Sequence, residues 1–296
     1  MVLESLIDTA AAKRHPLAVF LLALAFSSAA FWMAFFTFPD SASILAIAFI
    51  TIAFVPIIHS ILAETEEEES LVPSWSVGFL KRHFPVIKIY AWLFLGVVVS
   101  YSFWFVILPG DVRSQFFQVQ EKELGKITTL KSTLSGDASG VKSVAANCGR
   151  EFTCWFNVIF MNNATVLFWA VLFSFALGAG AIFLISWNAS IIGVVIGRYI
   201  MALSSAYSNL GEYSLAAAFF HGLFNAIGFI PHGLPEITGY FFGAIAGGII
   251  SAAISKKKFR THEFETIAKD AAVLVMAGIL LLLLGAAIEA SIIAAI

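Results

Sequence analysis

Charged residues are scarce in this sequence. Of its 296 residues only 12% are charged, whereas 60% are hydrophobic. Soluble globular chains carry about 25% charged residues, so the composition excludes both an ordinary soluble domain and a disordered chain. The 17 Lys and Arg residues are balanced by 19 Asp and Glu residues. This balance provides no basic field that could neutralise phosphates, and we expect no nucleic-acid partner.

Several motifs of soluble enzymes are also missing. The sequence contains no phosphate-binding glycine loop, no dinucleotide fingerprint and no Gly-x-Ser-x-Gly elbow. ATP-driven transport and serine-hydrolase chemistry therefore have no support from motifs. We expect no cofactor.

Long apolar runs are what the sequence does have, and a helix needs about 20 apolar residues to cross a bilayer. A further apolar segment, 214–255, is interrupted by Gly228, Pro231, Gly233 and Pro235, so we expect 214–229 to form a re-entrant half-helix before 234–254. The predicted fold is all-α, a polytopic transmembrane bundle of about six spans plus this re-entrant or broken helix. The six uninterrupted runs are 16–36, 42–63, 86–108, 165–187, 191–207 and 271–293.

A polar stretch divides the chain into three parts. Residues 1–108 are the N-terminal membrane helices, 109–160 form an extramembrane loop or arm, and 161–296 form the C-terminal membrane core. Within the arm, residues 115–134 suit a helix.

Lysine and arginine in short loops predict the orientation. Basic residues precede the first span, separate the second from the third and precede the last. If these clusters face the cytoplasm, the N-terminus is cytoplasmic and the arm is external. The sequence therefore predicts a multi-pass protein of the cell membrane, with the lipid bilayer as its first partner.

The only two cysteines, Cys148 and Cys154, both lie in the predicted external arm. A disulfide is favoured on an oxidising face, and five residues between the cysteines allow a short closed loop. The alternatives are two free thiols or half of a metal site.

Two rows of glycines have the spacing of closely packed membrane helices. Gly239, Gly243 and Gly247 share one helix face, and Gly193 with Gly197 forms a weaker pair. Small residues let two helix backbones approach each other. The rows predict either packing inside one subunit or the seam of a homodimer.

Polar residues in apolar surroundings are the candidate functional residues. His232 and Glu236 follow the predicted break at 228–235, where Glu236 would lie in the first turn of the next helix. His221 and Asn225 share a face upstream, and Asn188 completes the candidate polar site. Glu236 is interpreted as a helix cap or, with His232, as a proton relay or half of a metal site.

Metal binding and partner docking have weaker signals. Two histidines and one glutamate, here His221, His232 and Glu236, make a catalytic zinc ligand set, but the His-Glu-x-x-His pattern is missing. No metal centre is therefore expected. The acidic run 64–69 predicts a solvated helix end or, alternatively, a docking face for a basic partner.

Three segments resemble the stage II sporulation protein M family. Asn162-Asn-Ala-Thr-Val-Leu opens a span that ends at Gly178-Ala-Gly180, and Asn188-Ala-Ser-Ile-Ile-Gly193 resembles the family's Asn-Gly-x-x-x-Gly turn. Ile230-Pro-His-Gly-Leu-Pro-Glu236 resembles its Pro-His-Gly-x-x-Glu element. The resemblance covers roughly residues 160–255. It implies a polytopic membrane protein, and in spore formers a scaffold that recruits cell-wall hydrolases.

The functional hypothesis combines these observations. We expect a non-enzymatic membrane scaffold or assembly factor, with a homodimer or a membrane or cell-surface protein as its partner. A transporter or channel with a polar site at the broken helices is the first alternative, and an intramembrane metallohydrolase is the second.

Overall fold

The computed structural model describes residues 9–70, 79–124, 148–207, 211, 213–225 and 230–295. These residues form helices joined by turns, and none of them lies in a strand. The all-α fold predicted from the apolar runs is therefore confirmed.

Seven helices in the described ranges are long and apolar enough to cross a membrane. The short helix α1 (Thr9–Arg14) precedes them, and between them lie the 3-10 turn η1 (Pro39–Ser41), α5 (Gly110–Phe116), a helical segment at 118–124 and α9 (Ser214–Asn225). The seven long helices are α2 (Pro16–Thr37), α3 (Ala42–Ser70), α4 (Phe79–Ile107), α7 (Phe152–Leu177), α8 (Ala181–Ala206), α10 (Ile230–Ser255) and α11 (His262–Ala295).

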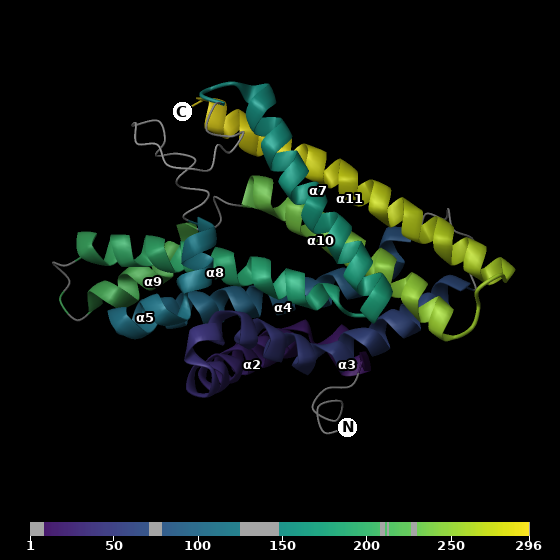
Figure 1. Cartoon of the computed structure of the whole chain (residues 1–296), viewed down its shortest axis with the longest axis horizontal. Coiled ribbons are helices and arrows are strands. Elements are labelled where there is room, and N and C mark those ends of the chain that lie inside the picture. Colours follow the sequence, from purple (N-terminus) through teal and green to yellow (C-terminus); the bar gives the residue numbers. More distant parts are fainter. Residues whose placement is uncertain are drawn as a thin grey trace.

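The long helices pack in two groups (Figure 1). Helices α7, α10 and α11 all contact one another, while α2 packs on α3 and α4, and α4 packs on α8. Helix α3 joins the groups because it contacts α10, α11 and α8. Because no water satisfies backbone groups inside a bilayer, continuous helices of this kind are what the composition demands.

The turn between α7 and α8 was predicted in the wrong place. Hydropathy predicted spans at 165–187 and 191–207, but the chain turns at 178–180, and Gly178 has a left-handed φ of 71°. Residues 178–187 are almost wholly apolar, so hydropathy does not detect a turn that depends on glycine. Asn188 and Gly193 consequently lie inside α8 rather than in a turn.

The predicted break before Glu236 is also wrong over most of its length. Residues 230–235 are already helical, and Glu236 is the seventh residue of α10 instead of lying in its first turn. Pro231 sits in the first turn, where a missing N–H costs nothing, whereas Pro235 lies inside α10 and removes one backbone hydrogen bond without ending the helix. The remainder of the predicted break, 228–229, lies outside the described residues.

The described residues do not support a re-entrant helix. Helix α9 is a separate helix of 12 residues that packs against α8. A Cβ at Gly222 of α9 would contact the Ile200 side chain of α8, so the two backbones lie close together. The bundle therefore has seven candidate spans rather than about six plus a half-helix.

Candidate functional site

Three groups of polar contacts are candidates for function. The carboxylate cluster consists of Asn163, His232, Glu236, Tyr240 and Glu289, from α7, α10 and α11. The Glu66 cluster consists of Glu66, Glu67, Lys256, Lys258 and Glu263. The arm base consists of α5, residues 118–124 and the partners that they contact.

The carboxylate cluster is built around a buried asparagine. Asn163 of α7 is 5% exposed, and its Oδ1 accepts a hydrogen bond of 2.8 Å from the Tyr240 hydroxyl of α10. The amide of Asn162 donates a second bond of 3.2 Å to the same oxygen. These bonds fix Asn163 beside Glu236, one turn before Tyr240 on α10.

A glycine makes room for Glu236. A Cβ at Gly285 of α11 would lie 2.6 Å from Glu236 Cγ and 3.1 Å from its Oε1. The Glu236 side chain therefore occupies the space left by the missing side chain of Gly285. Glu289 lies one turn after Gly285 on α11, so it shares the helix face that Glu236 contacts. Two carboxylates thus lie close together among three helices.

The other predicted site residues have different neighbours. His221 of α9 contacts the hydroxyl of Tyr207, with Nδ1 and oxygen 2.6 Å apart. The Asn188 amide donates to the Leu184 carbonyl of its own helix, at 2.8 Å. His232 lies one turn before Glu236 on α10, and the Asn225 side chain lies outside the described residues. Within the described part, no three His, Cys, Asp or Glu side chains gather as metal ligands, so His221, His232 and Glu236 form no metal centre there.

Sequence reasoning missed the partners of Glu236. Asn163, Tyr240 and Glu289 come from three helices, and their meeting depends on how these helices rotate against one another. One signal was present: Glu289 is an acidic residue within an otherwise apolar stretch of α11.

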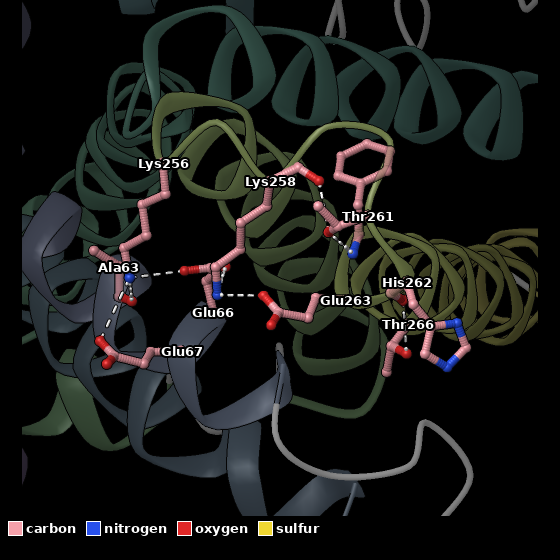
Figure 2. Close-up of polar contacts among 10 residues, drawn as sticks. Ala63, Glu66, Glu67, Lys256, Lys258, Thr261, His262, Glu263 and Thr266 are labelled. Carbon is pink, nitrogen blue, oxygen red and sulfur yellow. Dashed lines mark hydrogen bonds and ion pairs between the residues drawn. The ribbon is translucent and has the colours of Figure 1, made fainter.

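The Glu66 cluster lies at the turn between α10 and α11 (Figure 2). Glu66 at the end of α3 is fully buried, and its carboxylate lies 2.8 Å from Lys256 Nζ and 3.1 Å from Lys258 Nζ. Lys256 also donates to the Ala63 carbonyl at 3.0 Å, and Lys258 pairs with Glu263 at 3.2 Å. Two lysines from one turn therefore enclose a buried carboxylate of another helix.

Neighbouring glutamates of the acidic run differ in their exposure. Glu67 is 71% exposed, as expected of a solvated helix end, whereas Glu66 turns inward. Burial lowers the pKa of Lys258, but hydrogen bonds and charges from Glu66 and Glu263 outweigh this effect and raise the pKa above its ordinary value. Lys258 is thus held in its charged form, and the chain itself supplies basic partners for the acidic run.

The arm base is inserted between the membrane helices. Phe116 and Phe117 are fully buried; the Phe116 ring packs on Phe31 of α2, and the Phe117 ring packs on Phe105 of α4 with centroids 5.1 Å apart. Gln120 is buried between Ser43 of α3 and Ser190 of α8, and donates to the latter at 3.2 Å.

Ion pairing adds to this anchoring. Glu121 pairs with Arg198 of α8, whose Nε lies 2.9 Å from Glu121 Oε1. Of the predicted arm helix at 115–134, residues 115–116 end α5, residue 117 is a turn and 118–124 are helical, while 125–147 lie outside the described residues.

The far end of the arm is closed by the predicted disulfide. Cys148 and Cys154 are bonded, with Cα atoms 5.3 Å apart. The Trp155 indole donates to the Gly149 carbonyl at 2.9 Å across the same loop. Helix α7 begins at Phe152 and continues across the predicted boundary at residue 160.

The glycine rows contact helices of the same chain. A Cβ at Gly239 would lie 3.1 Å from the Gly278 carbonyl oxygen of α11. A Cβ at Gly243 or Gly247 would meet Leu167 or the Val171 carbonyl of α7, and those at Gly193 and Gly197 would meet Tyr101 and Phe105 of α4. These contacts leave the alternative of a homodimer seam without support.

Comparison with known proteins agrees with this architecture. The family model for stage II sporulation protein M matches residues 18–292. The match confirms the resemblance drawn from residues 160–255 and extends it over most of the chain. No curated protein and no solved structure matches the chain.

Proposed function

We propose that this chain, which belongs to the stage II sporulation protein M family, is a membrane scaffold that presents its arm to a protein partner on the outer face of the membrane. The observation that supports the proposal is the anchoring of the arm at both ends. Its first end is packed between α2, α3, α4 and α8, and its second end is closed by the Cys148–Cys154 disulfide.

Anchoring matters because flexible segments lose entropy when they bind. A binding segment that is held in place before the partner arrives avoids part of this cost. Burial of Phe116, Phe117 and Gln120 holds the base of the arm against the bundle. Such fixation is suited to recruiting another protein at a defined position on the membrane.

Photocrosslinking in native membranes tests the proposal. A photoreactive residue at position 122, which is exposed beside the arm base, should give one discrete protein adduct that mass spectrometry can identify. As a control, the same photoreactive residue replaces His262, which is 91% exposed and lies at the opposite end of the bundle. Gln120→Ala removes the bridge between Ser43 and Ser190 and should lower the adduct yield several-fold by loosening the arm.

Two results would contradict the scaffold proposal. One is an adduct at position 122 that consists only of lipid. The other is an adduct whose yield is unchanged when residues 126–146 are replaced by a short glycine-serine linker in a protein of normal thermal stability.

Transport is the second candidate, and the carboxylate cluster is the observation that favours it. Transporters commonly place ionisable side chains between membrane helices at the site that binds their ions. If transport were the function, Glu236→Gln would abolish the activity of the protein in cells, while removal of residues 126–146 would leave that activity intact. The scaffold proposal expects the opposite pattern.

A further inference from the structure

The turn between α10 and α11 divides its basic residues into two sets. Lys256 and Lys258 lie 2.8 and 3.1 Å from the carboxylate of Glu66 and belong to the Glu66 cluster. Lys257 and Arg260 are exposed, and neither forms an ion pair with another described residue. The Glu66 cluster therefore engages only two of the four basic residues in this turn.

Both exposed basic residues occupy positions where the backbone favours glycine. Lys257 has a left-handed φ of 59°, and Arg260 has one of 76°. The N–H groups of Lys257 and Lys258 donate to the carbonyls of Ile254 and Ala253, at 2.9 and 3.0 Å. Lys257 thus holds the left-handed position of a Schellman motif, which is usually glycine. A side chain is unfavourable at both positions, so the turn geometry does not explain why these residues are basic.

Helix stabilisation does not explain both charges either. The hydroxyl of Thr261 accepts a hydrogen bond of 3.2 Å from the Phe264 N–H, so Thr261 caps the start of α11 and Arg260 directly precedes the cap. The start of a helix carries a partial positive charge, which disfavours a cation, whereas the end of a helix, where Lys257 lies, favours one. A negatively charged group outside the two helices accounts for Lys257 and Arg260 together.

The turn lies at the level of lipid headgroups. Helix α10 ends at Ser255 and α11 begins at His262, and both helices are long and apolar enough to cross a membrane. Phe259, between the two basic residues, is 56% exposed, and the guanidinium carbon of Arg260 lies 5.7 Å from the centroid of its ring. Exposed aromatic and basic side chains in this combination suit the boundary between headgroups and acyl chains.

We propose that Lys257, Phe259 and Arg260 bind the headgroup of an anionic phospholipid in the leaflet around the α10–α11 turn. The two cations contact the negatively charged headgroup, and Phe259 inserts beside the acyl chains. Basic residues in short loops predict that this turn faces the cytoplasm, and the cytoplasmic leaflet carries anionic lipids. A lipid is favoured over an acidic protein because two flanking spans bring the turn to the headgroups in every copy of the chain. The proposal is independent of the scaffold function.

Native mass spectrometry of the full chain in a non-ionic detergent tests the proposal, with phosphatidylglycerol as the probe. The wild type should bind it more tightly than phosphatidylcholine, which carries no net charge. Lys257→Gly and Arg260→Gly should each weaken binding about fivefold, and the double variant roughly 25-fold, which corresponds to about 1 kcal/mol for each basic residue near an anionic membrane surface. Lys122→Gln, at an exposed lysine of the arm base, should leave the affinity unchanged.

Thermal unfolding without added lipid separates lost binding from a damaged turn. Glycine adopts a left-handed φ without strain, so Lys257→Gly and Arg260→Gly should unfold at the wild-type temperature or above it. Arg260→Lys keeps the charge and should retain most of the affinity, whereas Arg260→Gln keeps a side chain of similar length and should lose as much affinity as Arg260→Gly.

Four results would overturn the proposal. The first is equal binding of phosphatidylglycerol and phosphatidylcholine by the wild type, and the second is an unchanged affinity for phosphatidylglycerol in the double glycine variant. The third is displacement of phosphatidylglycerol by an equal concentration of inorganic phosphate, which would indicate a site for free anions. The fourth is a protein adduct instead of a phospholipid adduct when a photoreactive residue replaces Phe259 in native membranes.

Discussion

Replacing Glu66 with glutamine is expected to lower the free energy of unfolding by about 3 kcal/mol, the low end of the range for removing one partner of a buried ion pair. The substitution leaves Lys256 and Lys258 in place but removes the charge that both contact, at 2.8 and 3.1 Å. Because α3 and the turn between α10 and α11 meet at this point, the loss should loosen the junction of the two helix groups. Thermal and denaturant unfolding in the same detergent would measure it.

Glu67→Gln is the matched control. Glu67 is adjacent in sequence and contacts Lys256 at 3.5 Å, but it is 71% exposed. Surface ion pairs contribute about 0–1 kcal/mol, so this variant should unfold almost like the wild type. Equal losses in the two variants would show that burial of Glu66 does not determine the stability of this junction.

Gly247→Ala is expected to destabilise the chain by about 2 kcal/mol, within the range for overfilling a packed interior. A Cβ at this position would contact the Val171 carbonyl oxygen and lie 2.9 Å from the Phe175 nitrogen, and neither backbone atom can rotate away. Helices α7 and α10 would have to separate. This cost exceeds the gain of about 1 kcal/mol that alanine gives over glycine in a helix.

Gly233→Ala on the same helix provides a control of opposite sign. No atom lies within 4 Å of a Cβ at Gly233, so alanine should raise the unfolding temperature slightly. If Gly247→Ala were as stable as wild type but changed the molar mass of the protein in detergent, the glycine row would belong to a subunit interface instead of the α7–α10 contact.

The sequence predicted the helices better than their ends. Apolar runs such as 16–36 predict helices from their length alone, because a helix needs about 20 apolar residues to cross a bilayer. The corresponding helix, α2, covers Pro16–Thr37. The turn at Gly178 was missed by hydropathy, although the family resemblance ended a span there. Pro235 is typical of a helix break, but α10 begins at Ile230 and continues through it.

Two of the five residues of the carboxylate cluster, His232 and Glu236, were predictable. Glu236 is visible as an acid within an apolar segment, but Asn163, Tyr240 and Gly285 acquire their roles from the rotation of three helices about their axes. The same applies to Glu66. Its neighbours in the acidic run have identical chemistry, and only the packing of α3 against α10 decides which glutamate is buried.

The most direct test of the account is the location of the arm relative to the basic turn between α10 and α11. Seven crossings would place the α2–α3 turn and the arm on one side of the membrane, and the end of α3 and the α10–α11 turn on the other. Single cysteines that replace Asp40 or Lys122 should therefore react with a membrane-impermeant maleimide in intact cells. The native cysteines should give no background, because they are bonded to each other. Cysteines at Glu67 and His262 should react only after permeabilisation. The reverse pattern would contradict both the orientation and the proposed display of the arm outside the cell.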